Sequence, residues 1–192
     1  MRVRFTETVG AGLRKMFSRQ RLTSTIKKSG DAVSVFLRKH YEKKDKAEPN
    51  RLGGDRTHFW RQIGSSVQPA EVKGGSVSIR ITDRRFPQKL YGGPIVPKRA
   101  KALTIPIHPA AHGRGARELG PKVGGLFILR SKGGAAFLAG KLGGRLTLYY
   151  ILLKRVFQHP WPGTLPPARS MKWVFTRTFR MTLKANLKKQ TK

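Results

Sequence analysis

From residue 91 to residue 118 the chain reads YGGPIVPKRAKALTIPIHPAAHGRGARE. The Gly-Gly-Pro at 92–94 is typical of a turn, and a basic loop follows it. The apolar residues at 102–107 favour a short strand. Because proline cannot donate a ladder hydrogen bond, Pro106 indicates that this strand lies at a sheet edge. The segment therefore positions backbone and presents charge, and it contains no catalytic motif.

Before this segment, the spacing of apolar residues predicts helices and then a strand. Residues 6–17 favour a short helix, and 24–44 predict a longer one that continues into a polar loop. Asp55 is a candidate cap for a third helix, whose apolar face would hold Phe59, Trp60, Ile63 and Val67. Alternation of Val77, Ile79 and Ile81 with polar residues then predicts a half-buried strand.

After the segment, the pattern favours strands and a last helix. Residues 124–130 and 135–138 predict a hairpin, and 146–156 a long strand whose first part is apolar on both faces. The prolines of 160–167 indicate a rigid, exposed connector.

Residues 168–189 predict an amphipathic helix. Four cations fall within an arc of about 80° at helical periodicity: Arg177, Arg180, Lys184 and Lys188. The opposite side is apolar and holds Met171, Val174, Phe175 and Met181. Such a helix packs on its own domain, or its basic stripe faces DNA or an acidic partner; a membrane-surface helix is a third reading.

We expect an α+β fold, with N-terminal helices on a mostly antiparallel sheet and a C-terminal amphipathic helix. Three parts are predicted: an arm or short helix at 1–22, a core domain at 23–167, and a basic helix and tail at 168–192. The core would carry an extended loop at 83–101, of which 83–90 is basic. A chain of 192 residues fits one such domain.

Charge is the dominant feature of the composition. Lys and Arg number 41 against 9 Asp and Glu, a net charge of +32. The last acid is Glu118, and 15 Lys and Arg follow it. Because so much like charge repels itself, we expect a polyanion, above all nucleic acid, or acidic partner surfaces. There is no Cys, which excludes disulfides and thiol nucleophiles. No signal peptide or membrane span is predicted, so we expect a soluble intracellular product.

Residues suited to catalysis are few and scattered. His108 and His112 are four apart, but Pro109 interrupts any helix and no HExxH glutamate accompanies them. The glycines near Lys141 do not have phosphate-loop spacing. We therefore expect no catalytic, cofactor-binding or metal residues and no enzyme. Phe59, Trp60 and Trp173 stand beside cations, where core or interface packing is favoured over base stacking.

Two segments carry a resemblance to a known family. They are NRLGGDRTHFW at 50–60 and GGPIVPKRAKALTIPI at 92–107, which continues to residue 118. Together they resemble the virion morphogenesis proteins of tailed phages, the tail-completion or neck proteins related to phage Mu protein G and its phage HK97 counterpart. The chain departs from the family at 159–167, where HPWPGTLPP replaces an Arg-Pro-Phe-like element.

The resemblance implies a structural protein at the head–tail junction of the virion, made in the host cytoplasm. It would form a homo-oligomeric ring, such as a hexamer, that joins portal-side connector proteins to tail terminator or tube proteins. Packaged double-stranded DNA would pass through the lumen, with no membrane and no cofactor involved. Lys98, Arg99 and Lys101 of the basic loop, with the four cations of the last helix, would face DNA or a partner. Leu103, Ile105 and Ile107 would form a subunit interface.

Two other functions fit parts of this pattern. A basic RNA-binding protein of ribosomal type would have the same charge and glycine content, but the KALTIP stretch has no evident role in it. A nucleic-acid enzyme or its accessory factor would need more acids to hold metal ions.

Overall fold

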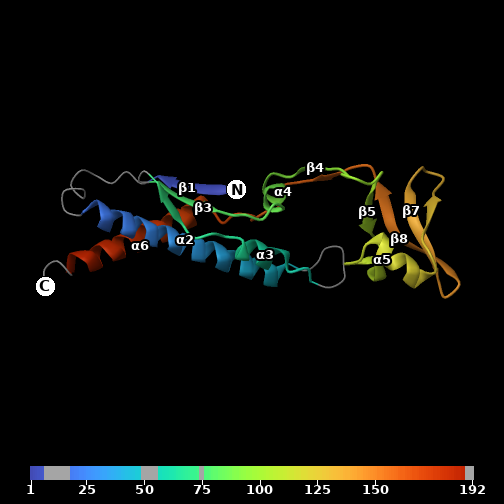
Figure 1. Cartoon of the computed structure of the whole chain (residues 1–192), viewed down its shortest axis with the longest axis horizontal. Coiled ribbons are helices and arrows are strands. Elements are labelled where there is room, and N and C mark those ends of the chain that lie inside the picture. The colour runs from blue at the N-terminus through green and yellow to red at the C-terminus, as the bar shows by residue number, and fades with distance from the viewer. Residues whose placement is uncertain (7–17, 49–55, 74–75, 189–192) are drawn as a thin grey trace. The chain divides into compact units, whose positions relative to one another are not determined.

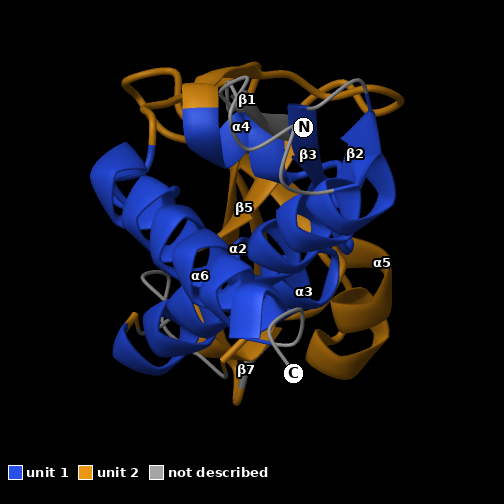
Figure 2. Ribbon diagram, turned by 90° about the vertical axis from the view of Figure 1, so that its left-hand side faces the viewer, with its two compact units in different colours: residues 1–47, 58–90, 161–192 blue, residues 48–57, 91–160 orange. Residues whose placement is uncertain are grey.

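The fold is α+β, with antiparallel sheets, as the sequence predicted. The computed structural model describes residues 1–6, 18–48, 56–73 and 76–188 (Figure 1). The chain forms two compact units, coloured separately in Figure 2. Unit 1 comprises Met1–Ala47, His58–Leu90 and Trp161–Lys192, and unit 2 comprises Glu48–Thr57 and Tyr91–Pro160. The expected single core at 23–167 thus holds parts of both units, because residues 91–160 bury their own separate cluster of side chains.

A long helix, α2 (Arg19–Ala47), is the central element of unit 1. It begins before the predicted 24–44 and continues through the polar stretch that was expected to start a loop. Its buried face includes Ile26, Val33 and Leu37. Gly30 lies where this helix meets the sheet, since a Cβ there would be 2.6 Å from Ala70 Cβ and 2.6 Å from Val77 Cγ1. Glycine therefore permits the close approach of helix and sheet.

The sheet of unit 1 has the strand order β1-β3-β2, all antiparallel. Its strands are β1 (Arg2–Thr6), β2 (Glu71–Lys73) and β3 (Ser76–Arg80). In β3, Val77 and Ile79 are buried while Ser76 and Ser78 are half-buried, which confirms the predicted alternation. Ile81 continues the buried side and forms an isolated bridge with Val67.

The third predicted helix is present as α3 (Phe59–Ser65), with Trp60 and Ile63 buried. Asp55, its expected cap, lies outside the described residues. His58 precedes the helix in a left-handed conformation, with φ of 50°. Asp45, from the end of α2, takes the capping role, because its carboxylate accepts hydrogen bonds from the His58 ring at 2.9 Å and the Arg61 backbone at 3.2 Å.

Two loop predictions for unit 1 were wrong. The expected basic loop at 83–90 contains a helix, α4 (Phe86–Tyr91), because Phe86 is fully buried against Tyr41. The connector at 160–167 is not wholly exposed: Thr164 is buried, and the Trp161 backbone donates a hydrogen bond to the Lys89 carbonyl at 2.8 Å. Residues 6–17, the expected first helix, are described only at residue 6, which ends β1.

The chain enters and leaves the main part of unit 2 through a two-stranded antiparallel ribbon. It pairs β4 (Gly93–Ile95) with β9 (Val156–Gln158). The predicted glycine turn leads into it, and Gly92 has φ of 70°. A Cβ on Gly92 would collide with the Gln158 carbonyl, so glycine is needed there. The expected extended loop at 83–101 is thus only partly irregular, since it holds α4 and β4.

The main sheet of unit 2 has the order β5-β8-β7-β6. Its strands are β5 (Leu103–Pro106), β6 (Phe127–Arg130), β7 (Ala136–Leu142) and β8 (Arg145–Leu153). The edge position of β5 and the hairpin of β6 and β7 are confirmed. The expected strand at 146–156 is instead two, because the chain leaves β8 after Leu153 and enters the ribbon at Val156.

Short helical segments cover one face of this sheet. They are η1 (Pro109–Ala111), α5 (Ala116–Leu119) and η2 (Gly120–Val123). A bulge between Leu138 and Ala139 lets two consecutive residues of β8, Tyr149 and Tyr150, both enter this core. The Tyr150 hydroxyl donates a hydrogen bond to the Arg114 carbonyl at 3.0 Å, which ties the helical segments to the sheet.

Candidate functional site

The predicted C-terminal helix is α6 (Ala168–Lys188), and it presents the basic stripe outward. Arg177, Arg180, Lys184 and Lys188 are all exposed. The opposite side packs into the core of unit 1 through Met171, Phe175 and Phe179. The structure therefore brings together these four sequence-predicted cations on one helix face.

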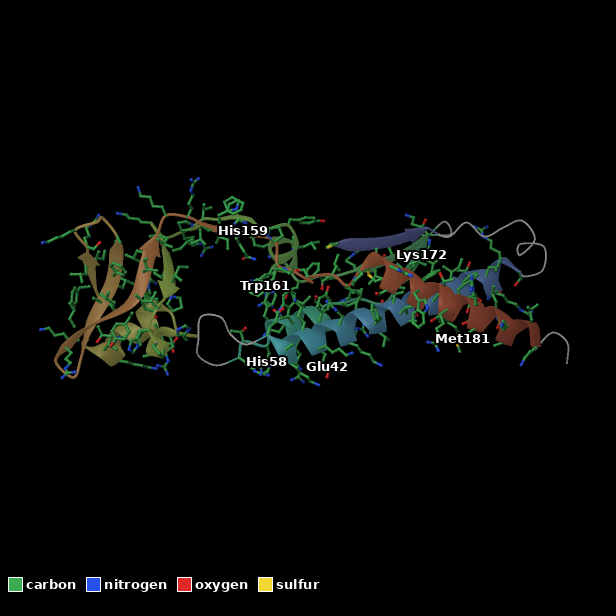
Figure 3. All side chains as sticks on the ribbon, turned by 180° about the vertical axis from the view of Figure 1, so that it is seen from behind. Glu42, His58, His159, Trp161, Lys172 and Met181 are labelled. Carbon is green, nitrogen blue, oxygen red and sulfur yellow. The ribbon has the colours of Figure 1, made fainter. Side chains whose placement is uncertain are left out.

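The apolar side of α6 was predicted incorrectly in part. Met181 was expected in the buried seam, but it is 61% exposed (labelled in Figure 3). Trp173 was expected in a core or an interface; at 58% exposed it lies outside the core, and its place in an interface stays a prediction. Both lie four residues from Arg177, and residues four apart stack along one side of a helix, so they share the basic face. The four-residue spacing was the signal that could have placed them there.

These residues form a shallow groove of about 510 Å³. It is lined by Trp173, Thr176, Arg177, Arg180, Met181, Leu183, Lys184 and Leu187. The Arg177 guanidinium lies 5.0 Å from the centre of the Trp173 ring, a cation–π distance. The groove thus combines exposed cations with an accessible aromatic surface.

Acids of unit 1 do not neutralise this groove within the described residues. Acids of unit 1 form ion pairs with cations outside the groove, as in Lys27–Asp31 at 2.9 Å and Arg85–Asp83 at 2.6 Å. Among the described residues, no carboxylate lies within 4.0 Å of the charged groups of Arg177, Arg180 or Lys184. Such a surface attracts a polyanion, and its indole ring can stack on a base or pack against an apolar side chain.

The second predicted basic group belongs to unit 2. Lys98, Arg99 and Lys101 are exposed between β4 and β5. Exposed apolar side chains precede them, namely Tyr91 at 69% and Val96 at 56%. The two basic groups are therefore carried by different units.

The predicted interface residues lie on β5 and just beyond it. Leu103 and Ile105 are half-buried, and Ile107 is 46% exposed. Because alternate strand residues share a face, the three side chains lie on one side of the sheet. The Ile107 backbone donates a hydrogen bond to the Tyr149 carbonyl at 2.9 Å, which continues the pairing with β8.

The aromatic pair of α3 serves the core of unit 1, as favoured from the sequence. Trp60 is buried and stacks with Tyr41 at 6.0 Å between ring centres. Lys44 lies 4.8 Å from the Trp60 ring, and Arg85 lies 5.0 Å from the ring of Phe59. These cations cover the edge of a core and do not mark a base-stacking site.

The histidines singled out in the sequence make local contacts. His108 Nδ1 accepts a hydrogen bond from the Ala110 backbone at 3.2 Å, and its ring packs edge-on to Tyr149. His112 follows η1 as its C-terminal cap. In the described ranges, no three His, Asp or Glu residues gather as a metal-binding group.

Ionisable groups with shifted pKa values support structure in unit 1. The hydrogen bond from the Arg85 side chain lowers the pKa of Asp83, against a smaller opposing effect of burial. Burial raises the pKa of Tyr41, whose hydroxyl is enclosed in the core.

Among the described residues, none of the helices has the length and apolar character of a membrane-spanning segment.

Compared with family models, curated proteins and solved structures, the chain gives no match.

Proposed function

We propose that this chain is a structural virion protein of a tailed phage, a tail-completion or neck component that joins the head connector to the tail around the DNA channel. The observation that carries the proposal is the segment 92–118, with its resemblance to that family. In unit 2 this segment supplies a glycine-dependent ribbon, an exposed basic stretch and an edge strand. The exposed basic stretch and the edge strand support the proposal, because both are available to neighbouring chains in a ring.

Charge supports the same proposal. A protein with net charge +32 around a DNA passage would meet the phosphates that compensate its self-repulsion. The groove on α6, with Arg177, Arg180 and Lys184, is the surface we assign to this contact or to acidic neighbours. In the proposed ring, such as a hexamer, Leu103, Ile105 and Ile107 would meet another subunit or a connector protein.

An RNA-binding protein of ribosomal type is the second candidate. The exposed Trp173 beside Arg177 favours it, because aromatic side chains stack on unpaired bases. Binding assays with single-stranded RNA and duplex DNA of equal length, at matched salt, separate the two candidates. A neck component should bind duplex DNA with little sequence preference, whereas a ribosomal-type protein should prefer structured or single-stranded RNA.

The direct test is electron microscopy of phage particles assembled without this gene. We expect filled heads and complete tails that do not join, and the wild-type gene supplied in trans should restore joined particles. Normal infectious particles in its absence would contradict the proposal.

A further inference from the structure

The main sheet of unit 2 has a second face that is apolar across all four strands. Ile105 pairs with Ile151, Ile151 with Phe137, and Phe137 with Leu129. Because directly paired residues project from the same side of a sheet, these four side chains form one continuous row. All four are half-buried.

Further apolar residues extend this row towards both ends of the strands. By the same register, Leu103 and Leu153 share the face at one end, and Phe127, Ala139 and Leu148 share it past the bulge. Three large side chains on it are well exposed: Ile107 at 46%, Phe127 at 44% and Leu146 at 58%. We call this surface the open face.

The open face lies opposite the helical segments. The core of unit 2 is built from Ala111, Leu119, Val123, Tyr149 and Tyr150, with Leu126 and Leu138 beside them. The residues of the open face belong to neither described core, although Ala139 among them is buried. Within the described residues, one face of this sheet is thus covered and the other is not.

The sequence of β8 indicates that the second face should also be covered. It reads RLTLYYILL, which is nearly continuous in apolar residues. Strands of this kind are typical of sheets buried on both faces, whereas a solvated face alternates with polar residues. An apolar surface of this extent on a protein usually marks an interaction site.

The positive charge of unit 2 indicates what kind of partner covers the open face. Lys141 pairs with Leu146 on the open face and is exposed. Residues 91–160 contain 12 Lys and Arg and one acid, Glu118, which is 3.9 Å from Lys122 in the helical layer. A second copy would bring the same cations against these. Apart from Phe127 and Phe137 the apolar residues of the face are aliphatic, and the register places one cation, Lys141, on it, so the face offers nucleic acid little stacking surface and few phosphate contacts.

We propose that the open face is a docking surface for an acidic amphipathic helix of another protein. The helix would lay its apolar side on the Ile105–Ile151–Phe137–Leu129 row and place carboxylates near Lys141. This would complete a layered arrangement in which helices cover both faces of the sheet. The inference goes beyond the neck proposal and does not depend on it. Within the proposed neck, it assigns Leu103, Ile105 and Ile107 to a partner protein and not to another subunit.

A synthetic helix tests the proposal with the full chain. The probe is a fluorescently labelled 18-residue peptide with leucines on one face and glutamates on the other, and binding is measured by anisotropy. Phe127→Thr with Leu146→Thr should weaken binding by about tenfold or more, because two exposed apolar contacts are lost. Ile128→Thr is the matched control, since Ile128 is 60% exposed but faces the other side of β6. Circular dichroism verifies that each variant is folded.

Two charge-reversal variants, one on each face of the sheet, test the role of charge. Lys141→Glu should also weaken binding of the acidic peptide, whereas Arg130→Glu, on the helix-covered side by its pairing with Ala136, should not. Equal binding by the Phe127/Leu146 variant and the wild type would overturn the proposal. So would loss of binding on Trp173→Ala alone, which would assign the peptide to α6. Self-association that requires Phe127 and Leu146 would also overturn it, in favour of a second copy.

Discussion

The sheets of the two units are both antiparallel, yet their central strands differ in how they use their two faces. In unit 1, β3 reads SVSIR, with Val77 and Ile79 buried and serine on the other side. In unit 2, β8 reads RLTLYYILL and is apolar on both sides, while helical segments cover one. The difference indicates that unit 1 closes its own core, whereas unit 2 is built to share a surface.

The largest difference that we expect between the two units is in their binding of nucleic acid. Removing three cations of α6 (Arg177→Ala, Arg180→Ala, Lys184→Ala) should reduce the slope of log affinity for duplex DNA against log salt by about 2.7. The affinity lost at 0.1 M salt should then exceed the affinity lost at 1 M salt by roughly 500-fold. The matched triple variant in unit 2 is Lys98→Ala, Arg99→Ala and Lys101→Ala. We expect it to change the slope by less than about 1, because its cations lie on a bend and not along one rigid helix face. Titrations at four salt concentrations measure both slopes. A larger effect of the unit 2 variant would reverse the assignment.

Matched truncations test the difference in burial. Ile79→Ala empties a fully buried site in unit 1 and should cost about 3 kcal/mol of unfolding free energy. Ile151→Ala on the half-buried row of unit 2 should cost about 1 kcal/mol, since less apolar surface is lost from the interior.

Urea unfolding separates these effects, because all three tryptophans, Trp60, Trp161 and Trp173, belong to unit 1. Their fluorescence follows that unit, and far-ultraviolet circular dichroism follows both. Equal costs for the two truncations would mean that the open face is already covered within the chain.

Gly30→Ala probes the contact between helix and sheet in unit 1. The new methyl would lie 2.6 Å from Ala70 Cβ and Val77 Cγ1, so the helix must shift. Overpacking should cost about 2 kcal/mol, more than the roughly 1 kcal/mol that alanine contributes to helix propensity. Adding Ala70→Gly should restore part of the loss in urea midpoint. Full stability of Gly30→Ala alone would contradict the close approach.

One acid of each unit, Asp83 and Glu118, should differ in how much it contributes to the pH dependence of the unfolding free energy. Asp83 is 13% exposed and bound by Arg85, and this hydrogen bond holds its pKa in the folded state below the ordinary value of an aspartate. Its stabilisation is therefore present above the unfolded pKa and is lost as pH falls through the lower folded value. Asp83→Asn should cost about 1 kcal/mol at neutral pH and flatten the acid limb of the stability curve.

Glu118 is the contrasting acid in unit 2. It is exposed and 3.9 Å from Lys122, so Glu118→Gln should change stability by less than about 0.5 kcal/mol. Urea midpoints of both variants from pH 2 to pH 7 measure the difference. An equal response of the two acids would break the comparison.

Periodicity predicted the parts of the fold that depend on one buried face. The strand with Val77 and Ile79, the edge strand at 102–107 and the last helix are of this kind. It failed where long-range packing decides: burial of Phe86 turns a basic stretch into α4, and a bulge sends both Tyr149 and Tyr150 into one core. The division into two units has no local signal either.

The candidate surfaces show the same limit. The cations of α6 could be placed from the sequence, since helical periodicity alone sets them on one face. The open face could be predicted only in its β5 part, through Leu103, Ile105 and Ile107. Its other members come from three further strands, and only their register brings Phe137 and Leu129 into the same row.

The most direct test of the account is complementation of a phage that lacks this gene, with joined particles counted by electron microscopy. The gene carrying Phe127→Thr and Leu146→Thr should leave most heads and tails unjoined, while the gene carrying Ile128→Thr should join them as the wild type does. Equal numbers of joined particles from the two variants would contradict a role for the open face, and joined particles without any copy would contradict the neck function itself.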